Sequence, residues 1–174
     1  QYVDVFVDVE IEGPKTIVLQ LANPTGGATI AAPGTTTITI ADNDSPGTVQ
    51  FSAAAYSVAE NVAGGVYKLL VTRTGSSLAS GIVVNYAVTG GTATNGVDYT
   101  LADGSLTFGV GQTSLTIPML IHDDAAAEGP ETVLITLSSA TATLGINRTT
   151  TVTILDNEPA LTFSAPAYSA SEGA

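Results

Sequence analysis

The sequence predicts an all-β protein in which a two-sheet β-sandwich is repeated in tandem. Apolar residues alternate with a period of two along short runs, as at Val84, Tyr86 and Val88, which places one side of each strand in a core. Glycine-rich turn signals such as Gly64-Gly65 and Gly90-Gly91 separate these runs. No stretch keeps a helical period of 3.6 residues, and a composition rich in Thr, Val, Ala and Gly favours strands over helices.

An internal repeat organises the chain. A Glu-Gly-Pro motif that opens one apolar run recurs 116 residues later, and an Asp-Asn-acid motif that closes another recurs 114 residues later. A Phe-Ser and Tyr-Ser pair recurs 112 residues later. Three matches in the same order indicate a repeat whose loops differ slightly in length. The matched segments are 12–19 with 128–135, 37–44 with 151–158, and 51–60 with 163–172.

Only one copy of the repeat is complete, over residues 48–158. Residues 1–47 hold the C-terminal part of a preceding copy, and residues 159–174 hold the first strand of a following copy. Seven short strands in about 110 residues are typical of a two-sheet sandwich. We expect them at 49–52, 66–73, 82–88, 105–108, 113–121, 132–137 and 149–155.

The composition excludes several classes of function. Sixteen acidic residues face only four basic ones, so the chain would be repelled by nucleic acid and by anionic membranes. The absence of cysteine excludes disulfides, zinc-thiolate sites and cysteine nucleophiles. No apolar run reaches the roughly 18 residues that a membrane-spanning helix needs. This charge balance suits a cation as the partner.

Acidic residues of the complete copy avoid the expected strands and gather at the connections between them. Counting the strands up and down brings all of these connections to one end of the sandwich, together with the side chain of Asn157. Calcium takes six to eight oxygen ligands in irregular geometry, whereas magnesium demands a tighter octahedron. Eight carboxylates exceed what one ion needs, so the sequence predicts two or more calcium ions that share bridging carboxylates. The acidic residues are Glu60, Asp98, Asp123, Asp124, Glu128, Glu131, Asp156 and Glu158.

Two other interpretations of these acids remain open at the level of sequence. Acidic loops are often only solvated turns that keep a protein soluble. A pair of carboxylates could also serve a glycosidase, but the chain has no Trp and few aromatic residues to bind a sugar. His122 is the only histidine, and it is expected to be a loop side chain rather than a catalytic base. We therefore expect that the protein is not an enzyme.

These motifs together resemble the Calx-beta repeat, in particular the bacterial extracellular or surface type. The resemblance covers essentially the whole chain and implies a seven-stranded immunoglobulin-like sandwich, with the eight acids above at calcium-ligand positions. The incomplete first copy keeps four such positions but has Val7 and Lys15 where the complete copy has Asp123 and Glu131. That copy is therefore expected to bind fewer calcium ions or to bind them weakly. Its four positions are Asp8, Glu12, Asp42 and Asp44.

The resemblance and the repeat lead to a functional expectation. We expect a calcium-binding structural or adhesive module of a larger extracellular or cell-surface protein, in which calcium stiffens the junctions between repeats. A filament component is a variant of this expectation. Neighbouring repeats or like chains are expected to pack on residues 1–47 and 159–174, because isolated strands with open edges tend to pair. The alternatives are a regulatory calcium sensor and a repeat spacer that binds no metal.

Overall fold

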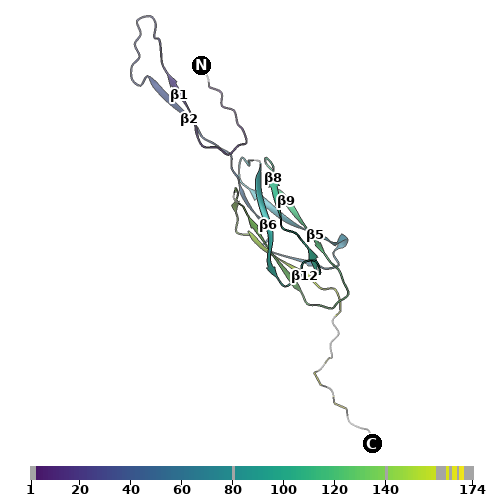
Figure 1. Cartoon of the computed structure of the whole chain (residues 1–174). Coiled ribbons are helices and arrows are strands. Elements are labelled where there is room, and N and C mark those ends of the chain that lie inside the picture. The colour runs from purple at the N-terminus through teal and green to yellow at the C-terminus, as the bar shows by residue number, and fades with distance from the viewer. Residues whose placement is uncertain are drawn as a thin grey trace.

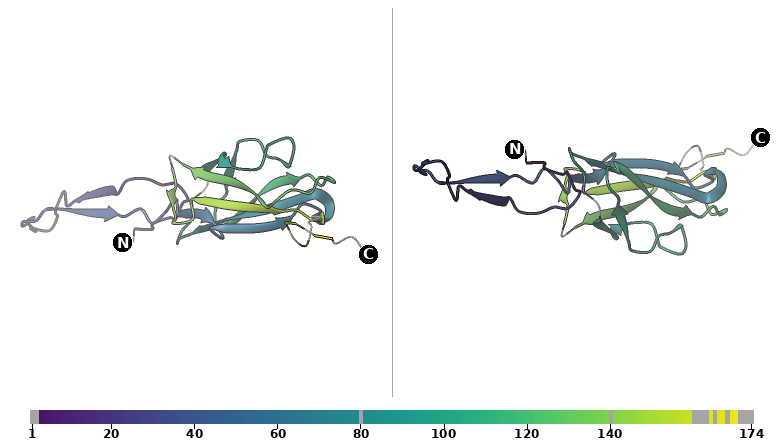
Figure 2. Two further views of the ribbon diagram at one scale, coloured as in Figure 1. Left: turned by 90° about the horizontal axis from the view of Figure 1, so that it is seen from below. Right: turned by 90° about the horizontal axis from the view of Figure 1, so that it is seen from above.

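The chain forms a β-hairpin that projects from one end of a two-sheet sandwich (Figure 1). The computed structural model describes residues 3–79, 81–139, 141–159, 164, 166–167 and 169–170. The views from below and from above show the same elongated arrangement (Figure 2). The strands are β1 (Lys15–Gln20), β2 (Thr35–Ile40), β3 (Thr48–Phe51), β4 (Ala55–Ala59), β5 (Val66–Thr74), β6 (Ile82–Gly91), β7 (Tyr99–Thr100), β8 (Gly104–Phe108), β9 (Ser114–Ile121), β10 (Glu131–Ser138), β11 (Thr143–Leu144) and β12 (Thr149–Leu155), with one 3-10 turn, η1 (Ala63–Gly65).

Each sheet of the sandwich has five strands. One has the order β4-β12-β10-β6-β8 and the other β11-β3-β5-β9-β7. Most neighbours are antiparallel, but β4 pairs parallel with β12, and β3 pairs parallel with β11. The all-β sandwich predicted from the sequence is thus confirmed.

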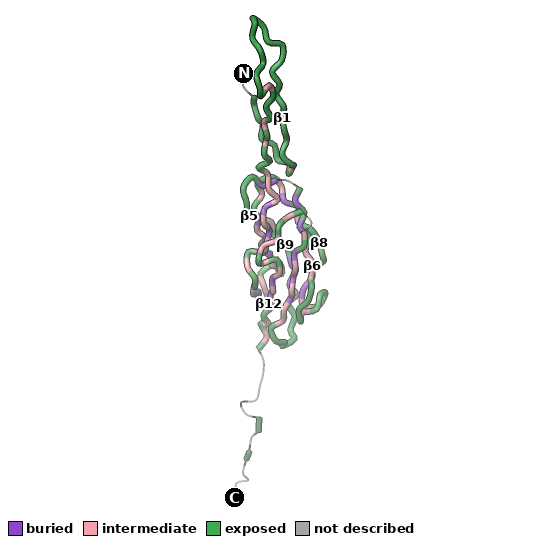
Figure 3. Tube along the Cα trace, turned by 90° about the vertical axis from the view of Figure 1, so that its left-hand side faces the viewer, coloured by how far each residue is buried: buried purple, intermediate pink, exposed green. Residues whose placement is uncertain are grey.

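Alternation along the strands builds the core between the two sheets. In β10, Val133, Ile135 and Leu137 point inward and are at most 2% exposed. Phe51 and Phe108 are fully buried and fill the space between the sheets. The buried residues are confined to this sandwich (Figure 3). A single continuous core of this kind makes the sandwich a rigid base for the loops at its ends.

The sandwich contains three strands more than the seven expected. The strands β7 and β11 are only two residues long, which is too short for an alternation pattern to reveal. The strand β4, Ala-Tyr-Ser-Val-Ala, contains two residues of low strand propensity, and pairing with β12 almost a hundred residues away holds it. The other strands lie within a few residues of the expected bounds.

The projecting hairpin pairs β1 with β2 in an antiparallel register from Lys15↔Ile40 to Gln20↔Thr35. Both strands remain largely exposed, including Val18 at 66% and Leu19 at 43% (Figure 3). Most of residues 159–174, the expected opening of a following copy, lie outside the described residues. Within the described part of the chain, no helix is long and apolar enough to cross a membrane.

Candidate metal centre

The end of the sandwich that faces away from the hairpin collects the acidic side chains. Glu60 follows β4, Asp98 precedes β7, and Asp156 follows β12. The long loop between β9 and β10 supplies Asp123, Asp124 and Glu128, while Glu131 is the first residue of β10 and Glu158 follows Asp156 after β12. Because strands from both sheets end here, residues that are nearly a hundred positions apart in the sequence become neighbours.

Two groups of carboxylates are close enough to share a cation. Oxygen atoms of Glu60, Asp123 and Glu158 lie within 4.8 Å of one another, and the same holds for oxygen atoms of the second group. Single oxygens at such separations can contact one central ion, since calcium–oxygen distances are about 2.3–2.6 Å. The second group consists of Asp98, Glu128 and Glu131.

A small cavity lies between these side chains. Its volume is about 10 Å³, roughly the room that one water-sized sphere occupies. His122 also faces this cavity, and its Nε2 shares a 2.8 Å hydrogen bond with the Thr100 hydroxyl. The carboxylates that line it are Glu60, Asp98, Asp124, Glu128, Glu131 and Asp156.

All eight acids predicted from the sequence are therefore in one place. Six are grouped in two triads, and Asp124 and Asp156 line the cavity beside them. The position of His122 at this cavity was not foreseen, since a lone histidine in the sequence gave no metal-site pattern. Its position directly before Asp123-Asp124 was the available signal.

Two buried oxygens in this cluster have no hydrogen-bond partner in the described part of the chain. They are Oε1 of Glu60 and Oε2 of Glu158. Glu60 is only 8% exposed, although glutamate is almost never buried without a partner. A buried carboxylate oxygen left unpaired costs free energy. The residues therefore fit a cation, because an ion between them would satisfy both atoms.

Backbone amides hold the acidic loops in shape. Asp156 accepts hydrogen bonds from the amides of Glu128 at 2.7 Å and Glu158 at 2.9 Å, so it ties the β9–β10 loop to the end of β12. Asp124 accepts a 2.6 Å bond from the Ala126 amide. These bonds engage both oxygens of Asp156 and one oxygen of Asp124, and they preorganise the loops before any ion arrives.

The carboxylates perturb one another's titration. The neighbouring carboxyl groups of Glu60 and Asp156, together with burial, raise the pKa of Glu158 to about 7. Burial and the Asp98 carboxylate raise the pKa of Glu131. The pKa of Asp156 is lowered, chiefly by the amide hydrogen bond from Glu158. Crowded like charges of this kind favour binding of either a proton or a metal cation.

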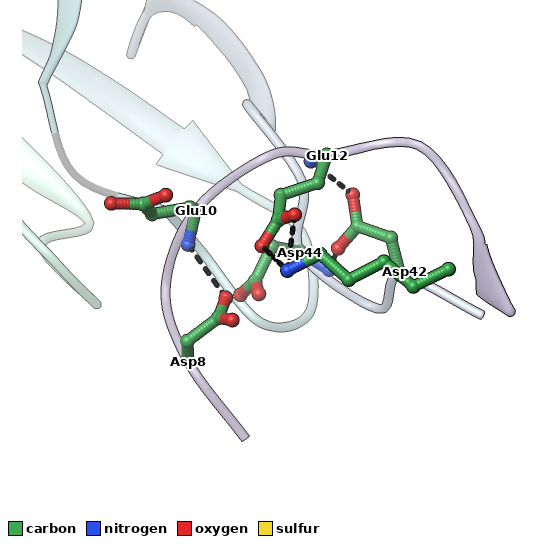
Figure 4. Close-up of polar contacts among 6 residues, drawn as sticks. Asp8, Glu10, Glu12, Asp42 and Asp44 are labelled. Carbon is green, nitrogen blue, oxygen red and sulfur yellow. Dashed lines mark hydrogen bonds and ion pairs between the residues drawn. The ribbon is translucent and has the colours of Figure 1, made fainter. Parts of the chain in front are cut away.

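The hairpin reproduces part of this arrangement (Figure 4). Asp42 accepts hydrogen bonds from the amides of Glu12 at 2.6 Å and Asp44 at 2.9 Å, as Asp156 does from Glu128 and Glu158. Asp8 accepts a 3.1 Å bond from the Glu10 amide, as Asp124 does from Ala126. The four acids predicted for the first copy thus lie together, and three hydrogen bonds recur at the spacing of the sequence repeat.

The acidic cluster of the first copy differs from that of the complete copy because it contains its own counter-ion. Lys15 donates a 2.6 Å hydrogen bond to Oε1 of Glu12, and its ammonium lies 2.5 Å from the other oxygen. Val7, at the position of Asp123, is 80% exposed and offers no ligand. Around these residues lies a more open cavity of about 450 Å³, which also contacts Phe6. The built-in ammonium already balances part of the negative charge there.

Comparison with known proteins connects the fold and the acidic end to one family. The sequence model of the Calx-beta domain matches residues 2–44 and again residues 42–158. Sodium/calcium exchanger 1 of Canis lupus familiaris is 32% identical in an alignment of 154 residues that covers 76% of this chain and 16% of that protein. Adhesion G-protein coupled receptor V1 of Danio rerio is 29% identical over 160 residues, 89% of this chain and 3% of that protein.

Solved structures agree with this relationship. The apo form of the Calx CBD1 domain superposes with a TM-score of 0.58 at 29% identity, covering 64% of this chain and 97% of that chain. The calcium binding domain CBD12 of CALX1.1 gives the same TM-score and identity, covering 63% of this chain and 44% of that one. The chain spans about a sixth of the length of the exchangers it matches. With its sandwich, its repeated acidic motifs and two matches to the family model, the chain belongs to the Calx-beta domain family.

Proposed function

We propose that the chain binds calcium at the acidic end of its complete repeat and serves as a structural module in a tandem array. The observation that supports this most directly is the pair of buried, unpartnered oxygens on Glu60 and Glu158, which belong to different loops. A divalent cation would satisfy both oxygens and offset the repulsion among the surrounding carboxylates.

The two triads suggest two ions. Glu60, Asp123 and Glu158 would hold one ion, and the triad of Asp98, Glu128 and Glu131 would hold the other. Calcium suits the site better than magnesium, because its ligands come from four separate loops and give an irregular oxygen set. The ions supply positive charge between loops that otherwise repel one another, so their binding stiffens this end of the sandwich.

The first copy is expected to contribute a weaker site. Asp8, Asp42 and Asp44 remain available, but Lys15 engages Glu12.

A calcium titration of the whole chain by calorimetry tests the proposal. The double variant Asp123→Asn/Asp124→Asn should lose the tightest binding. Asp103→Asn serves as a matched control, because Asp103 is an exposed acid that bonds the Val88 amide away from the cluster. Identical binding isotherms for the wild type and the double variant would refute the assignment of the site.

The affinity would also separate two roles. A stiffening module of a bacterial cell surface or filament should bind with a dissociation constant of about 10⁻⁴–10⁻³ M, whereas a sensor binds at about 10⁻⁷–10⁻⁵ M. The tandem repeats and the lysine-poor composition favour the first role, with an extracellular location and an adhesive function. The second candidate, a regulatory sensor, is favoured by the similarity to sodium/calcium exchanger 1 and to a domain described as calcium binding.

The hairpin supports a further part of the proposal, in which neighbouring repeats or like chains pack on residues 1–47 and 159–174. In the complete copy the strands matching β1 and β2 are β10 and β12, and these are flanked by β6 and β4. In the hairpin the equivalent edges and apolar side chains are exposed. Strands from the same or another molecule would cover them, and analytical ultracentrifugation of the chain at increasing concentration would reveal self-association.

A further inference from the structure

Arg73 is an unusual side chain of the sandwich, because it is charged and only 1% exposed. It occupies an inward-facing position of β5, in line with Leu69 and Val71. Arginine is almost never fully buried without a partner. In the described part of the chain, however, all hydrogen bonds of its side chain go to backbone carbonyl groups rather than to a carboxylate.

The carbonyl groups belong to two loops of the sandwich and to the linker that joins the sandwich to the hairpin. The Nε atom donates to Pro46 at 2.8 Å, and Nη2 donates to Ser45 at 3.3 Å. Nη2 also donates to Ala79 at 2.8 Å, and Nη1 donates to Gly109 at 3.2 Å. One planar group with several fixed donors thus holds the linker against both loops.

The linker backbone is fitted closely to this surface. The Ser45 amide donates to the Ser77 carbonyl at 2.9 Å, and the Ala79 amide donates to the Ser45 carbonyl at 3.0 Å. Gly47 has φ +72°, and a Cβ atom there would lie 2.8 Å from Leu78 and 3.1 Å from Nε of Arg73. A glycine is therefore needed for the linker to approach the guanidinium group.

The hydrogen bonds connect Arg73 to the junction, and its guanidinium group also lies over the Phe108 ring of the core, 5.8 Å from the centroid. Burying the guanidinium group costs desolvation free energy, and the resulting shift lowers the pKa of Arg73. Its ordinary pKa is so high that the group stays charged at neutral pH. Replacing buried charges by well-packed apolar residues is often neutral for a fold, so the core itself does not require this charge. Two of the four side-chain hydrogen bonds of Arg73 go to carbonyl groups of the linker, those of Ser45 and Pro46.

We propose that Arg73 is the positioning residue of the junction between consecutive repeats, and that it fixes the linker 45–47 on the sandwich without a metal ion. This inference rests on the proposed role as a tandem module and specifies how one junction is held. The calcium site lies at the other end, since β5 begins beside Leu120 near the acidic loops and ends at Thr74 beside the linker. Calcium and Arg73 therefore act on opposite ends of the repeat.

Hydrogen exchange of the whole chain tests the inference, comparing the wild type with Arg73→Met in 10 mM calcium and in chelator. In Arg73→Met the amides of Ser45 and Ala79 should exchange at least tenfold faster, while amides of the β5–β9 ladder keep their protection. In the wild type, chelator should leave the two junction amides unchanged. Arg148→Met is the matched control, because Arg148 is exposed on the same sandwich and should show wild-type exchange.

Three outcomes would overturn the inference. The first is that the junction amides keep their protection in Arg73→Met, and the second is that they lose it only together with the β5–β9 ladder, which would make Arg73 a residue of the core. Loss of junction protection in chelator would show that a metal ion holds the linker. If Arg73→Met does not fold, Arg73→Lys takes its place in the test. Lysine keeps the charge but lacks the planar guanidinium group, so the amides of Ser45 and Ala79 should again exchange faster while the β5–β9 ladder keeps its protection. Calcium calorimetry on Arg73→Met separates the two proposals, because the acidic site should still bind with wild-type affinity.

Discussion

Replacing Glu60 by glutamine should stabilise the sandwich in chelator but leave its stability nearly unchanged in calcium. In chelator, Glu60 is a buried carboxylate with an unpartnered oxygen beside other carboxylates. The amide of the variant removes one negative charge and can donate a hydrogen bond to a neighbouring carboxylate. With calcium, the same substitution removes a charged ligand from the ion.

The sizes of the two effects can be estimated. A hydrogen bond to a charged group contributes about 1.5–3 kcal/mol, so we expect Glu60→Gln to gain about 2 kcal/mol in chelator. An ion present at 100 times its dissociation constant stabilises the folded state by about 2.7 kcal/mol. If the lost ligand weakens binding about 100-fold, this contribution falls to about 0.4 kcal/mol at the same calcium concentration. In calcium, the loss of about 2.3 kcal/mol should therefore cancel the gain or exceed it slightly.

Urea denaturation of the whole chain at pH 7.5 measures these differences, once in chelator and once in 10 mM calcium. The informative quantity is the calcium-induced shift of the unfolding midpoint, which should be large for the wild type and for Asp103→Asn but small for Glu60→Gln. A variant that is less stable than the wild type in chelator, or that gains as much from calcium, would refute the reasoning.

Three further predictions follow from the described contacts. Because the folded-state pKa of Glu158 is raised to about 7, the protein in chelator should lose stability as the pH rises from about 4.5 through 7, and calcium should flatten this dependence. Urea unfolding midpoints across this pH range measure the effect, and a midpoint in chelator that rises with pH would contradict the prediction. Lys15→Gln frees Glu12 and should strengthen cation binding by the first copy, seen as added heat in calcium calorimetry at millimolar concentrations; an unchanged isotherm would count against a role for the ammonium. Gly91→Ala should destabilise the sandwich by at least about 2 kcal/mol in thermal or urea unfolding, because its Cβ would lie 2.1 Å from the Thr132 carbonyl oxygen at φ +126°. Gly96→Ala is its control, since φ there is also positive but nothing lies within 4 Å, and equal losses in both variants would mean that the clash is relieved.

The sequence was sufficient to predict the parts of the structure that depend on local pattern or on repetition. Alternation located β5, β6, β9, β10 and β12 to within a few residues, because each has one face in the core. The acids could be brought to one end by counting strands, since every connection involved joins strands that end there. The sequence repeat allowed the acidic cluster of the first copy to be predicted, and the hydrogen bonds to Asp42 match those to Asp156.

Features that depend on long-range contacts could not be predicted. Pairing with β12 defines β4, and no local signal in Ala-Tyr-Ser-Val-Ala specifies a parallel partner. The burial of Arg73 could have been suspected, because it continues the inward alternation of Leu69 and Val71. Its partners could not, since they are backbone carbonyls that only the folded loops bring together. The division of the acids into two triads likewise depends on side-chain positions that spacing does not determine.

The parallel pairing of β4 with β12 has a mechanical consequence. The five residue pairs from Thr151↔Ala55 to Leu155↔Ala59 connect an early strand of the repeat to its last strand. The linker and the end of β12 lie at opposite ends of the sandwich, so tension applied along an array of repeats would slide these two strands past each other (Figure 1). All ladder hydrogen bonds would then have to break together, rather than one after another as when a hairpin is peeled open. Single-molecule pulling should therefore give a high unfolding force for this repeat, and a proline at Val58, inside the ladder, should lower it.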